Sequence, residues 1–581
     1  MNIIIANSVG VDKNGYHIVH SPSRWSLGVK NYTDCIYYPW ELSYASSYLK
    51  QKFPEHNIKM LDGVLNSYTF EEYIKVISEY NPDVLVMEPS ARTYETDKLF
   101  AISVKEKFNA KIIFCGGLST AEPEKLLEVA DYVLQGEYEE TLLELLKTNF
   151  DESIEGLYPN NRRKIIDINT LPFPEDDDVS RIKYFEPNCE YKEIQFYISR
   201  GCPMKCNFCV AGNLYYEKPN WRPRSIQNII AEIKYLKNKY PEMEGLFLDE
   251  EVHNINKKFV LEFCDALIKN NLQHLKIDAM SEYYLLDEEI LYKMKEAGYY
   301  KLRVGIETAS DKIAKKMNLG NKFNLNKLFE VLEIANKIGM KMYGTFTVGG
   351  LGSNKNEDLK TVNLIYNLIS NNLLNDLQVS INTPQPGTPF YIEAKEKKYF
   401  ITEDWQSFDG GKGSVLSYPD YSKSEIDSMF KTALNKYDEA LKIRAENFKF
   451  DLKIKNNLDM IIKPNSKILI IRSYRMWLVD ILIDILLKRF KCGIIYQEEV
   501  QNLIIKHNFY KKYCYGNGFI KIDNFTSAML NEINDEQYDY IIVPVRNIRI
   551  NNYYNVQELL DSLNVKNKIL VDSFGEIKEL K

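Results

Sequence analysis

The fold is decided by residues 194–209, which read IQFYISRGCPMKCNFC. The first six of these residues predict a buried strand. Arg200-Gly201 then leads directly into three cysteines with the spacing C-x3-C-x2-C. Because the chain has only nine cysteines in 581 residues, chance spacing of this kind is roughly a two-in-a-thousand event. A cysteine loop at a strand end therefore indicates a metal or cluster site.

The number of thiols distinguishes the possible centres. A structural zinc ion prefers four closed ligands, and neither a fourth Cys nor a His lies nearby in the sequence. A 4Fe-4S cluster is usually held by four cysteines, so three leave one iron open to another ligand. The spacing therefore favours a 4Fe-4S cluster on Cys202, Cys206 and Cys209. The two weaker interpretations are a zinc site completed by a distant residue such as His253, and three buried thiols without metal.

The sequence on both sides of the cysteine loop predicts an α/β protein with three α/β regions. Residues 1–165 alternate strands and helices and predict a Rossmann-like parallel sheet, with a linker following over 166–192. Residues 193–419 repeat strand and helix six times, which predicts a partial (β/α)6 barrel with its active site at the carboxyl ends of the strands. The barrel strands are expected at 194–199, 245–249, 274–279, 301–305, 342–348 and 377–382. A helical extension over 420–465 and a small α/β domain of unknown role over 466–581 complete the chain.

Composition and charge narrow the class of protein. Apolar residues make up 45% and charged residues 27%, as in ordinary globular proteins. The net charge of -7 and the lack of a long basic run argue against a nucleic-acid partner, and Asn160 to Lys164 is interpreted as a solvated basic loop. The start of the chain does not resemble a signal peptide. The longest apolar stretch, Met476 to Leu487, is too short to cross a bilayer, so a cytoplasmic protein without a transmembrane segment is expected.

Several motifs together resemble a known family, the radical S-adenosylmethionine (SAM) enzymes with an N-terminal cobalamin-binding domain. They are Arg200-Gly201-Cys202-Pro203, Val304 to Thr308, Thr347 to Leu351 and Pro384 to Pro389. The resemblance covers about residues 1–445. It implies that SAM binds the open iron and that one electron releases a 5′-deoxyadenosyl radical. It also implies SAM contacts from Asp249, Glu250, Glu307 and Gly349.

The N-terminal region carries the second half of the resemblance. Gly116-Gly117 and Gly136-Glu137 follow strand ends, where open α/β sheets bind ligands. The resemblance implies that these four residues contact cobalamin. The family's frequent Asp-x-His-x-x-Gly loop is absent, since Asp62-Gly63 leads only to Val64 and Leu65, so no histidine is expected to ligate cobalt from below. His17, His20 and Trp25 are interpreted as part of an early loop.

The resemblance predicts an anaerobic enzyme that methylates an unactivated carbon with the help of cobalamin. An alternative is a cobalamin-independent radical SAM enzyme for cyclisation, rearrangement or carbon–carbon coupling, and a weaker one is a non-catalytic iron–sulfur redox or scaffold protein. A tRNA methylthiotransferase is disfavoured, because that family carries three further cluster cysteines in its N-terminal domain. In this chain only Cys35 and Cys115 precede the linker. The expected partners are a small-molecule, lipid or peptide substrate and a low-potential electron donor, either flavodoxin or ferredoxin.

Overall fold

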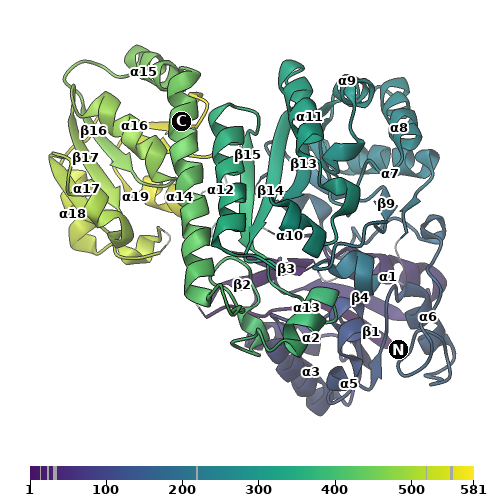
Figure 1. Ribbon diagram of the computed structural model, residues 1–581. Helices are drawn as coiled ribbons and strands as arrows, with labels where there is room; N and C mark the ends of the chain where they lie inside the picture. Colours follow the sequence, from purple (N-terminus) through teal and green to yellow (C-terminus); the bar gives the residue numbers. More distant parts are fainter. Residues whose placement is uncertain are drawn as a thin grey trace. The chain divides into compact units, whose positions relative to one another are not determined.

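The computed structural model describes residues 1–13, 15–21, 25–30, 36–186, 188–216, 220–518, 520–549 and 554–580 (Figure 1). The chain forms two compact units. The first comprises residues 1–362 and 373–432, and the second comprises residues 363–372 and 433–581. The N-terminal region and the barrel therefore belong to one unit.

The N-terminal region is a parallel five-stranded sheet with helices on both faces. Its strands are β1 (Asn2–Asn7), β4 (Asn57–Asp62), β5 (Val84–Met87), β6 (Lys111–Phe114) and β7 (Tyr132–Val133), in the order β4-β1-β5-β6-β7. Helices α1 (Trp40–Lys52) and α6 (Glu139–Lys147) share one apolar core, while α2 (Phe70–Ser78) and α3 (Tyr94–Phe108) share another. The strand order reverses between β1 and β5, which makes their carboxyl ends a topological switch point. The predicted Rossmann-like arrangement is confirmed.

The early segment that contains His17, His20 and Trp25 is not a loop. It forms an antiparallel hairpin of β2 (His17–Ser21) and β3 (Trp25–Lys30). The apolar and β-branched residues of these short runs favour strands, and pairing satisfies their backbone groups. The sequence interpretation was wrong here because each run is short and polar residues interrupt it.

The linker is irregular, as its prolines require, but it is firmly attached to the N-terminal sheet. Lys50 Nζ lies 2.6 Å from Glu175 and 2.7 Å from Asp178, and Lys59 Nζ lies 2.6 Å from Asp178. Asp178 also accepts a hydrogen bond from the backbone N–H of Met60 at 2.7 Å. The acidic run of the linker thus anchors the chain before it enters the barrel.

The central region is the predicted partial barrel of six parallel strands. These are β8 (Glu193–Phe196), β11 (Gly245–Leu248), β12 (Lys276–Ser281), β13 (Tyr299–Glu307), β14 (Lys341–Val348) and β15 (Asp376–Ile381), in the order β15-β14-β13-β12-β11-β8. Helices α7 (Ile226–Lys239), α8 (Lys257–Lys269), α9 (Glu288–Glu296) and α11 (Leu325–Lys337) connect successive strands. A side chain at each of their N-caps accepts a backbone hydrogen bond, which fixes where each helix begins.

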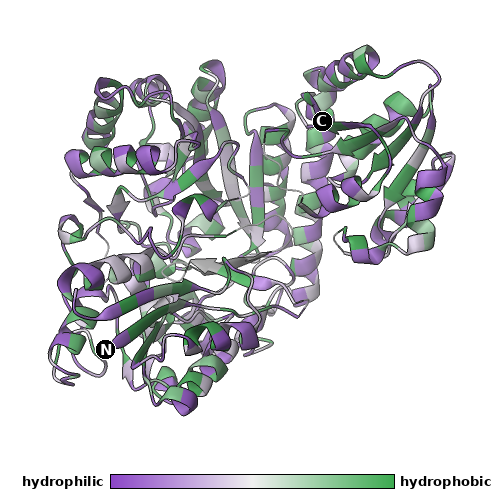
Figure 2. Cartoon of the chain, turned by 180° about the vertical axis from the view of Figure 1, so that it is seen from behind, coloured by the Kyte–Doolittle hydropathy of each residue, from purple (hydrophilic) through white to green (hydrophobic). Residues whose placement is uncertain are grey.

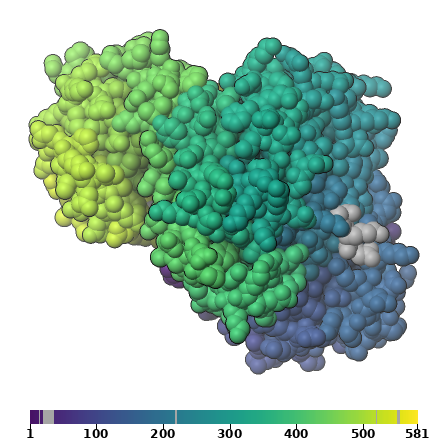
Figure 3. All heavy atoms as spheres, in the orientation of Figure 1, coloured from purple at the N-terminus to yellow at the C-terminus, as the bar shows by residue number. Residues whose placement is uncertain are grey.

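Residues after the last barrel strand return to the N-terminal region. Trp405 lies edge-on to Tyr94 of α3 at 5.8 Å between ring centroids, and Lys125 Nζ lies 3.7 Å from the Trp405 ring. The space-filling view shows this green segment directly against the purple and blue N-terminal residues (Figure 3). The barrel and the N-terminal sheet are therefore in contact at the end of the barrel as well as at its start.

The second unit contains a six-stranded mixed sheet that follows helices α14 (Lys423–Asn447) and α15 (Phe450–Ile461). Its strands are β16 (Lys467–Ile471), β17 (Lys491–Tyr496), β18 (Lys511–Cys514), β19 (Tyr540–Pro544), β20 (Asn567–Val571) and β21 (Ile577–Leu580). The order is β18-β17-β16-β19-β20-β21, with β21 antiparallel to its neighbour, and the predicted α/β character of this region is confirmed. The longest apolar stretch of the sequence is helix α16 (Met476–Leu486), which is largely buried beside strands that are mostly hydrophobic (Figure 2). Within the described ranges, none of the helices combines the length and hydropathy needed to cross a bilayer.

Candidate functional site

A cavity of about 270 Å³ opens where the barrel strands end. It lies within the first unit and is lined by Cys202, Cys206 and Cys209. Apolar side chains also line it, including Phe208, Phe247, Met280, Tyr343 and Phe346. The three predicted cluster ligands are thus brought together at the carboxyl ends of the strands, which is where this class of barrel places its active site.

The cysteine loop places its thiols in a mostly dry environment. Cys202 and Cys206 are 8% and 6% exposed. Burial raises the pKa of Cys206 to about 12, although the nearby Lys322 ammonium opposes this effect. Burial also raises the pKa of Cys209, while the backbone N–H groups of Gly212 and Ala211 lower it by stabilising the thiolate. Three free thiols at one cavity fit a cluster with one open iron.

Gly212 is required for the loop to fold back on itself. A Cβ at this position would lie 2.5 Å from the carbonyl oxygen of Met204. Asn213 then donates hydrogen bonds to the carbonyl oxygens of Cys206 and Cys209, at 2.6 and 2.8 Å. The residues after the last cysteine therefore fix the backbone of the cysteines themselves.

A buried lysine and two carboxylates stand beside the cysteines. Lys322 Nζ lies 3.0 Å from Glu282 and 3.6 Å from Glu307. Burial alone would lower the pKa of Lys322, but Glu282, Cys206 and Glu307 together raise it well above its usual value. Glu307, predicted as a SAM contact, lines the cavity with a left-handed backbone of φ 65°. A Cβ on Gly305 would lie 2.7 Å from both the Glu307 carboxylate and Lys322 Nζ, so this glycine makes room for the pair.

The sequence prediction did not include Lys322 or Glu282. Glu282 follows the end of β12, so the strand-end rule that selected Asp249 and Glu307 could have found it. Lys322 belongs to a short turn between Gly320 and Lys322, and no sequence signal marks it.

The acidic residues after β11 separate into two groups. Asp249 and Glu251 line the cavity, whereas Glu250 is fully buried outside it. The Glu250 carboxylate accepts a hydrogen bond from the Ile198 N–H at 3.2 Å and lies 3.0 Å from Nδ1 of His253. Nε2 of His253 lies 2.7 Å from the Tyr299 hydroxyl, so this histidine is engaged away from the cysteines. The geometry favours Asp249 and Glu251 over Glu250 as cavity carboxylates.

Gly349, the last predicted SAM contact, shapes a turn behind the cavity. Its backbone has φ 70°, its N–H donates to Asp358 at 2.8 Å, and a Cβ there would lie 2.5 Å from Ile426. Thr347, two residues earlier, lines the cavity instead. The glycine therefore positions the strand end without itself facing the cavity.

The four predicted cobalamin contacts lie at the ends of β6 and β7. Gly116 has φ 88°, and a Cβ there would lie 2.2 Å from the carboxylate of Glu88, which is 2% exposed. Burial and then the neighbouring Glu41 raise the pKa of Glu88 well above its usual value. Gly117 is buried at the start of a short helix, and Gly116 pairs with Gly136 across the sheet edge. Glu137 forms ion pairs with barrel arginines, so it does not face an open ligand site.

The switch point of the N-terminal sheet has its own buried polar group. Ser8 Oγ and Thr93 Oγ1 each lie 2.5 Å from the Asp97 carboxylate, and the Gly10 N–H donates to Ser8 Oγ at 2.9 Å. Burial raises the pKa of Asp97 to about 7, even though both hydroxyl groups oppose this shift. These contacts join the loops that follow β1 and β5, where a doubly wound sheet of this strand order binds its ligand.

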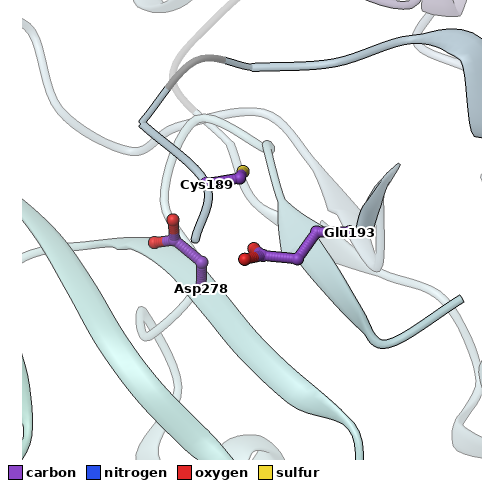
Figure 4. Close-up of side chains that lie close together, drawn as sticks. All are labelled: Cys189, Glu193 and Asp278. Atoms are coloured by element: carbon purple, nitrogen blue, oxygen red, sulfur yellow. The ribbon is translucent and has the colours of Figure 1, made fainter. Parts of the chain in front are cut away.

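One other group of potential metal ligands occurs in the described part of the barrel. The side chains of Cys189, Glu193 and Asp278 point toward one another from a loop and two strands (Figure 4). Two cations already occupy this place, since Lys301 Nζ lies 2.9 Å from Asp278 and Arg303 binds Asp278 through Nε at 2.9 Å. These cations would repel a metal ion, so we interpret the group as a charge-compensated network.

Comparisons with known proteins agree with this geometry. The family described as "Radical SAM superfamily" matches residues 196–365, from the first barrel strand through the cysteine loop and beyond β14. Residues 196–365 of this chain thus match the radical SAM superfamily. A 4Fe-4S cluster and SAM are the cofactors of that superfamily, and the family prediction is confirmed.

The similar proteins include methyltransferases. An uncharacterized methyltransferase of Pyrococcus horikoshii is 26% identical over 387 residues, which are 64% of this chain and 81% of that protein. Bacteriochlorophyllide d C-8(2)-methyltransferase of Chlorobaculum tepidum is 23% identical over 61% of this chain and 76% of its own length. Among solved structures, the radical SAM methyltransferase TsrM of Kitasatospora setae, with cobalamin and a [4Fe-4S] cluster bound, has a TM-score of 0.52 at 13% identity. The matched region covers 69% of this chain and 76% of the TsrM chain. At this identity the similarity establishes the fold alone.

Proposed function

We propose that the protein is a cobalamin-dependent radical SAM methyltransferase that modifies an unactivated carbon of a small-molecule, lipid or peptide substrate. The observation that carries the proposal is the convergence of three free thiols in one cavity at the carboxyl ends of the barrel strands. The cavity belongs to the same unit as a Rossmann-like sheet with a topological switch point. The methyltransferase relatives support the choice of reaction.

The residues that line the cavity have different roles in the proposed reaction. Cys202, Cys206 and Cys209 would hold the cluster, and Asp249, Glu251 and Glu307 supply the carboxylates that a SAM amino group needs. Lys322 keeps the carboxylates and thiolates from repelling one another, since it lies between Glu282 and Glu307. When bound, the cluster and SAM supply a carbon-centred radical and cobalamin supplies a methyl group.

The apolar lining protects this chemistry. Phe247, Met280, Tyr343 and Phe346 surround the polar groups and exclude water from a reactive radical. An external low-potential electron donor, such as flavodoxin or ferredoxin, would provide the electron, as radical SAM chemistry requires a reductant.

The N-terminal switch point is the place we assign to cobalamin. Ser8, Gly10 and Thr93 line the two loops at this point, and Asp97 fixes their spacing. A Cβ on Gly10 would lie 3.0 Å from Thr93, so a bare backbone is needed where the loops approach. This arrangement fits a ligand bound by backbone and hydroxyl groups rather than by a histidine.

The experiment is anaerobic purification with cobalamin supplied, followed by reduction in the presence of SAM. We expect about one cobalamin per chain, as for a single switch-point site, together with 5′-deoxyadenosine and S-adenosylhomocysteine as products. A protein that yields no 5′-deoxyadenosine would contradict the radical step, and one that yields no S-adenosylhomocysteine would contradict methyl transfer.

A second candidate is a cobalamin-independent radical SAM enzyme for cyclisation, rearrangement or carbon–carbon coupling. It is favoured by one observation, namely that Glu137 is engaged with barrel arginines and not with an open ligand site. It predicts 5′-deoxyadenosine from a protein that retains no cobalamin after gel filtration.

A further inference from the structure

We infer that the N-terminal region positions the iron–sulfur cluster through a buried clamp on the cysteine loop, with Glu137 as its central residue. The clamp comprises Glu137, Glu139 and Arg162, which hold Arg200, Arg222 and the backbone of residues 214–215. The inference rests on the cluster of the proposed function but on neither cobalamin nor methyl transfer.

The clamp holds the first end of the loop through Arg200, which lies two residues before Cys202. Arg200 is 2% exposed, and its Nη1 lies 3.2 Å from Glu137 and 2.7 Å from Glu139. Its guanidinium also lies over the Tyr44 ring at 4.6 Å. Three groups of the N-terminal region therefore surround one side chain of the barrel and leave it little freedom.

The second end of the loop returns to the same carboxylate. The short strands β9 (Ser199–Arg200) and β10 (Arg222–Pro223) pair antiparallel, which sets Arg222 directly opposite Arg200. Arg222 Nη2 lies 2.9 Å from the same oxygen of Glu137 that Arg200 contacts. Both ends of the cysteine loop thus meet at one buried carboxylate from the N-terminal region.

The middle of the loop is held by Arg162, which belongs to the basic stretch Asn160 to Lys164 that the sequence predicts to be solvated. Arg162 donates hydrogen bonds to the carbonyl oxygens of Leu214 and Tyr215, at 2.9 and 2.7 Å. The adjacent Asn213 binds the carbonyl oxygens of Cys206 and Cys209. A continuous set of contacts therefore connects the N-terminal region with the cysteine backbone.

The same geometry explains the glycine before Glu137. Gly136 has φ 67°, and a Cβ there would lie 2.6 Å from Arg162 Nη2 and 3.3 Å from the Tyr215 carbonyl oxygen. Gly136 and Glu137, which the sequence predicts as cobalamin contacts, thus contact residues that hold the cysteine loop. Because coupling between sites is reciprocal, a ligand that moves the turn after β7 would also alter the cluster environment.

The test compares Glu137→Gln with the unmodified full-length protein after anaerobic cluster reconstitution. The substitution keeps the shape of the side chain but removes the charge that the two arginines share, which weakens two charge-assisted hydrogen bonds. We therefore expect the loss of iron to a ferrous chelator to accelerate about tenfold or more, which corresponds to about 1.4 kcal/mol or more. The EPR signal of the reduced cluster with SAM should broaden, and Glu137→Asp should restore part of both properties.

Two further variants keep the test decisive. Glu128→Gln makes the same chemical change at an exposed carboxylate of the N-terminal region, 3.8 Å from Lys98, and should leave iron loss and EPR unchanged. Arg162→Met removes the contacts to the Leu214 and Tyr215 carbonyl oxygens. Because Arg162 is partly exposed, the same iron-loss and EPR measurements on this variant test the clamp if Glu137→Gln does not fold.

Iron loss and EPR of Glu137→Gln that match those of Glu128→Gln would overturn the inference. An unchanged cluster combined with lost cobalamin would also overturn it, because Glu137 would then be a cofactor contact. Failure of methyl transfer in the unmodified protein would contradict the proposed function but would leave these cluster measurements valid.

Discussion

The barrel holds two groups of thiols and carboxylates that look alike in composition and differ in surroundings. The first, around Cys206, lies at the carboxyl ends of the strands and opens on a cavity, with the ammonium group of Lys322 beside it. The second, around Cys189, lies toward the amino ends of the strands and is paired with both Lys301 and Arg303. Strand-end location, an adjacent cavity and incomplete charge compensation therefore identify the ligand site better than the residue types do.

The largest difference between the two groups is expected when one thiol is removed from each. Cys206→Ala should abolish SAM cleavage, because two cysteines cannot hold a cluster with a defined open iron. Cys189→Ala, the matched control, should keep full iron content and SAM cleavage. Iron and sulfide analysis together with 5′-deoxyadenosine assays provides the measurement, and retained cleavage by Cys206→Ala would overturn the cluster assignment.

The next effect concerns the ammonium group of the first site. Lys322→Met leaves Glu282 and Glu307 uncompensated beside the thiolates, so the cluster becomes harder to reduce and its midpoint potential shifts to more negative values. SAM cleavage should fall by about tenfold or more, in line with a loss of at least about 1.4 kcal/mol. EPR-monitored redox titration checks the potential, and an unchanged value would show that Lys322 has only a packing role.

In the second group the expected effect is on stability and not on the cluster. Asp278→Asn leaves Lys301 and Arg303 buried with one carboxylate fewer, which should cost about 3–5 kcal/mol of folding free energy. Thermal unfolding measures the loss, while iron content per folded chain should not change. Loss of iron in this variant would contradict the separation of the two groups.

The smallest effect is a pH dependence in the second group. Burial and then Asp278 raise the pKa of Glu193 to about 8, so the folded protein keeps this carboxyl protonated while the unfolded chain ionises near its ordinary value. The unfolded state then binds fewer protons, and stability falls as pH rises from about 4.5 to about 8.

Glu193→Gln removes this titration. Its Tm should match that of the unmodified protein at about pH 4 and exceed it by about 2–4 °C at about pH 8. Thermal scans over this range test the sign, and a parallel dependence in both proteins would contradict the raised pKa. Glu124→Gln removes an exposed carboxylate of the same chain and serves as the control, since it should keep the pH dependence of the unmodified protein.

Much of the fold could be predicted because each prediction used local patterns. Short apolar runs such as Val84–Met87 and Lys467–Ile471 form buried parallel strands here, since such strands are covered on both faces. The hairpin β2–β3 was missed because its short runs lack that continuous pattern. Strands β18 and β21 were missed for the same reason, as each has only four residues and most of these are exposed or half-buried.

The spacing of the cysteines is enough to predict which thiols lie together, because three cysteines within eight residues must be close to one another in any fold. It could not determine which neighbours face them. Glu250 and Glu251 are adjacent in the chain, yet of the two it is Glu251 that lines the cavity. Lys322 reaches the site from 113 residues beyond Cys209, and Glu137 holds the loop from 65 residues before Cys202. Only the tertiary structure decides such contacts, because they depend on which side chains the packed barrel brings within a few ångströms.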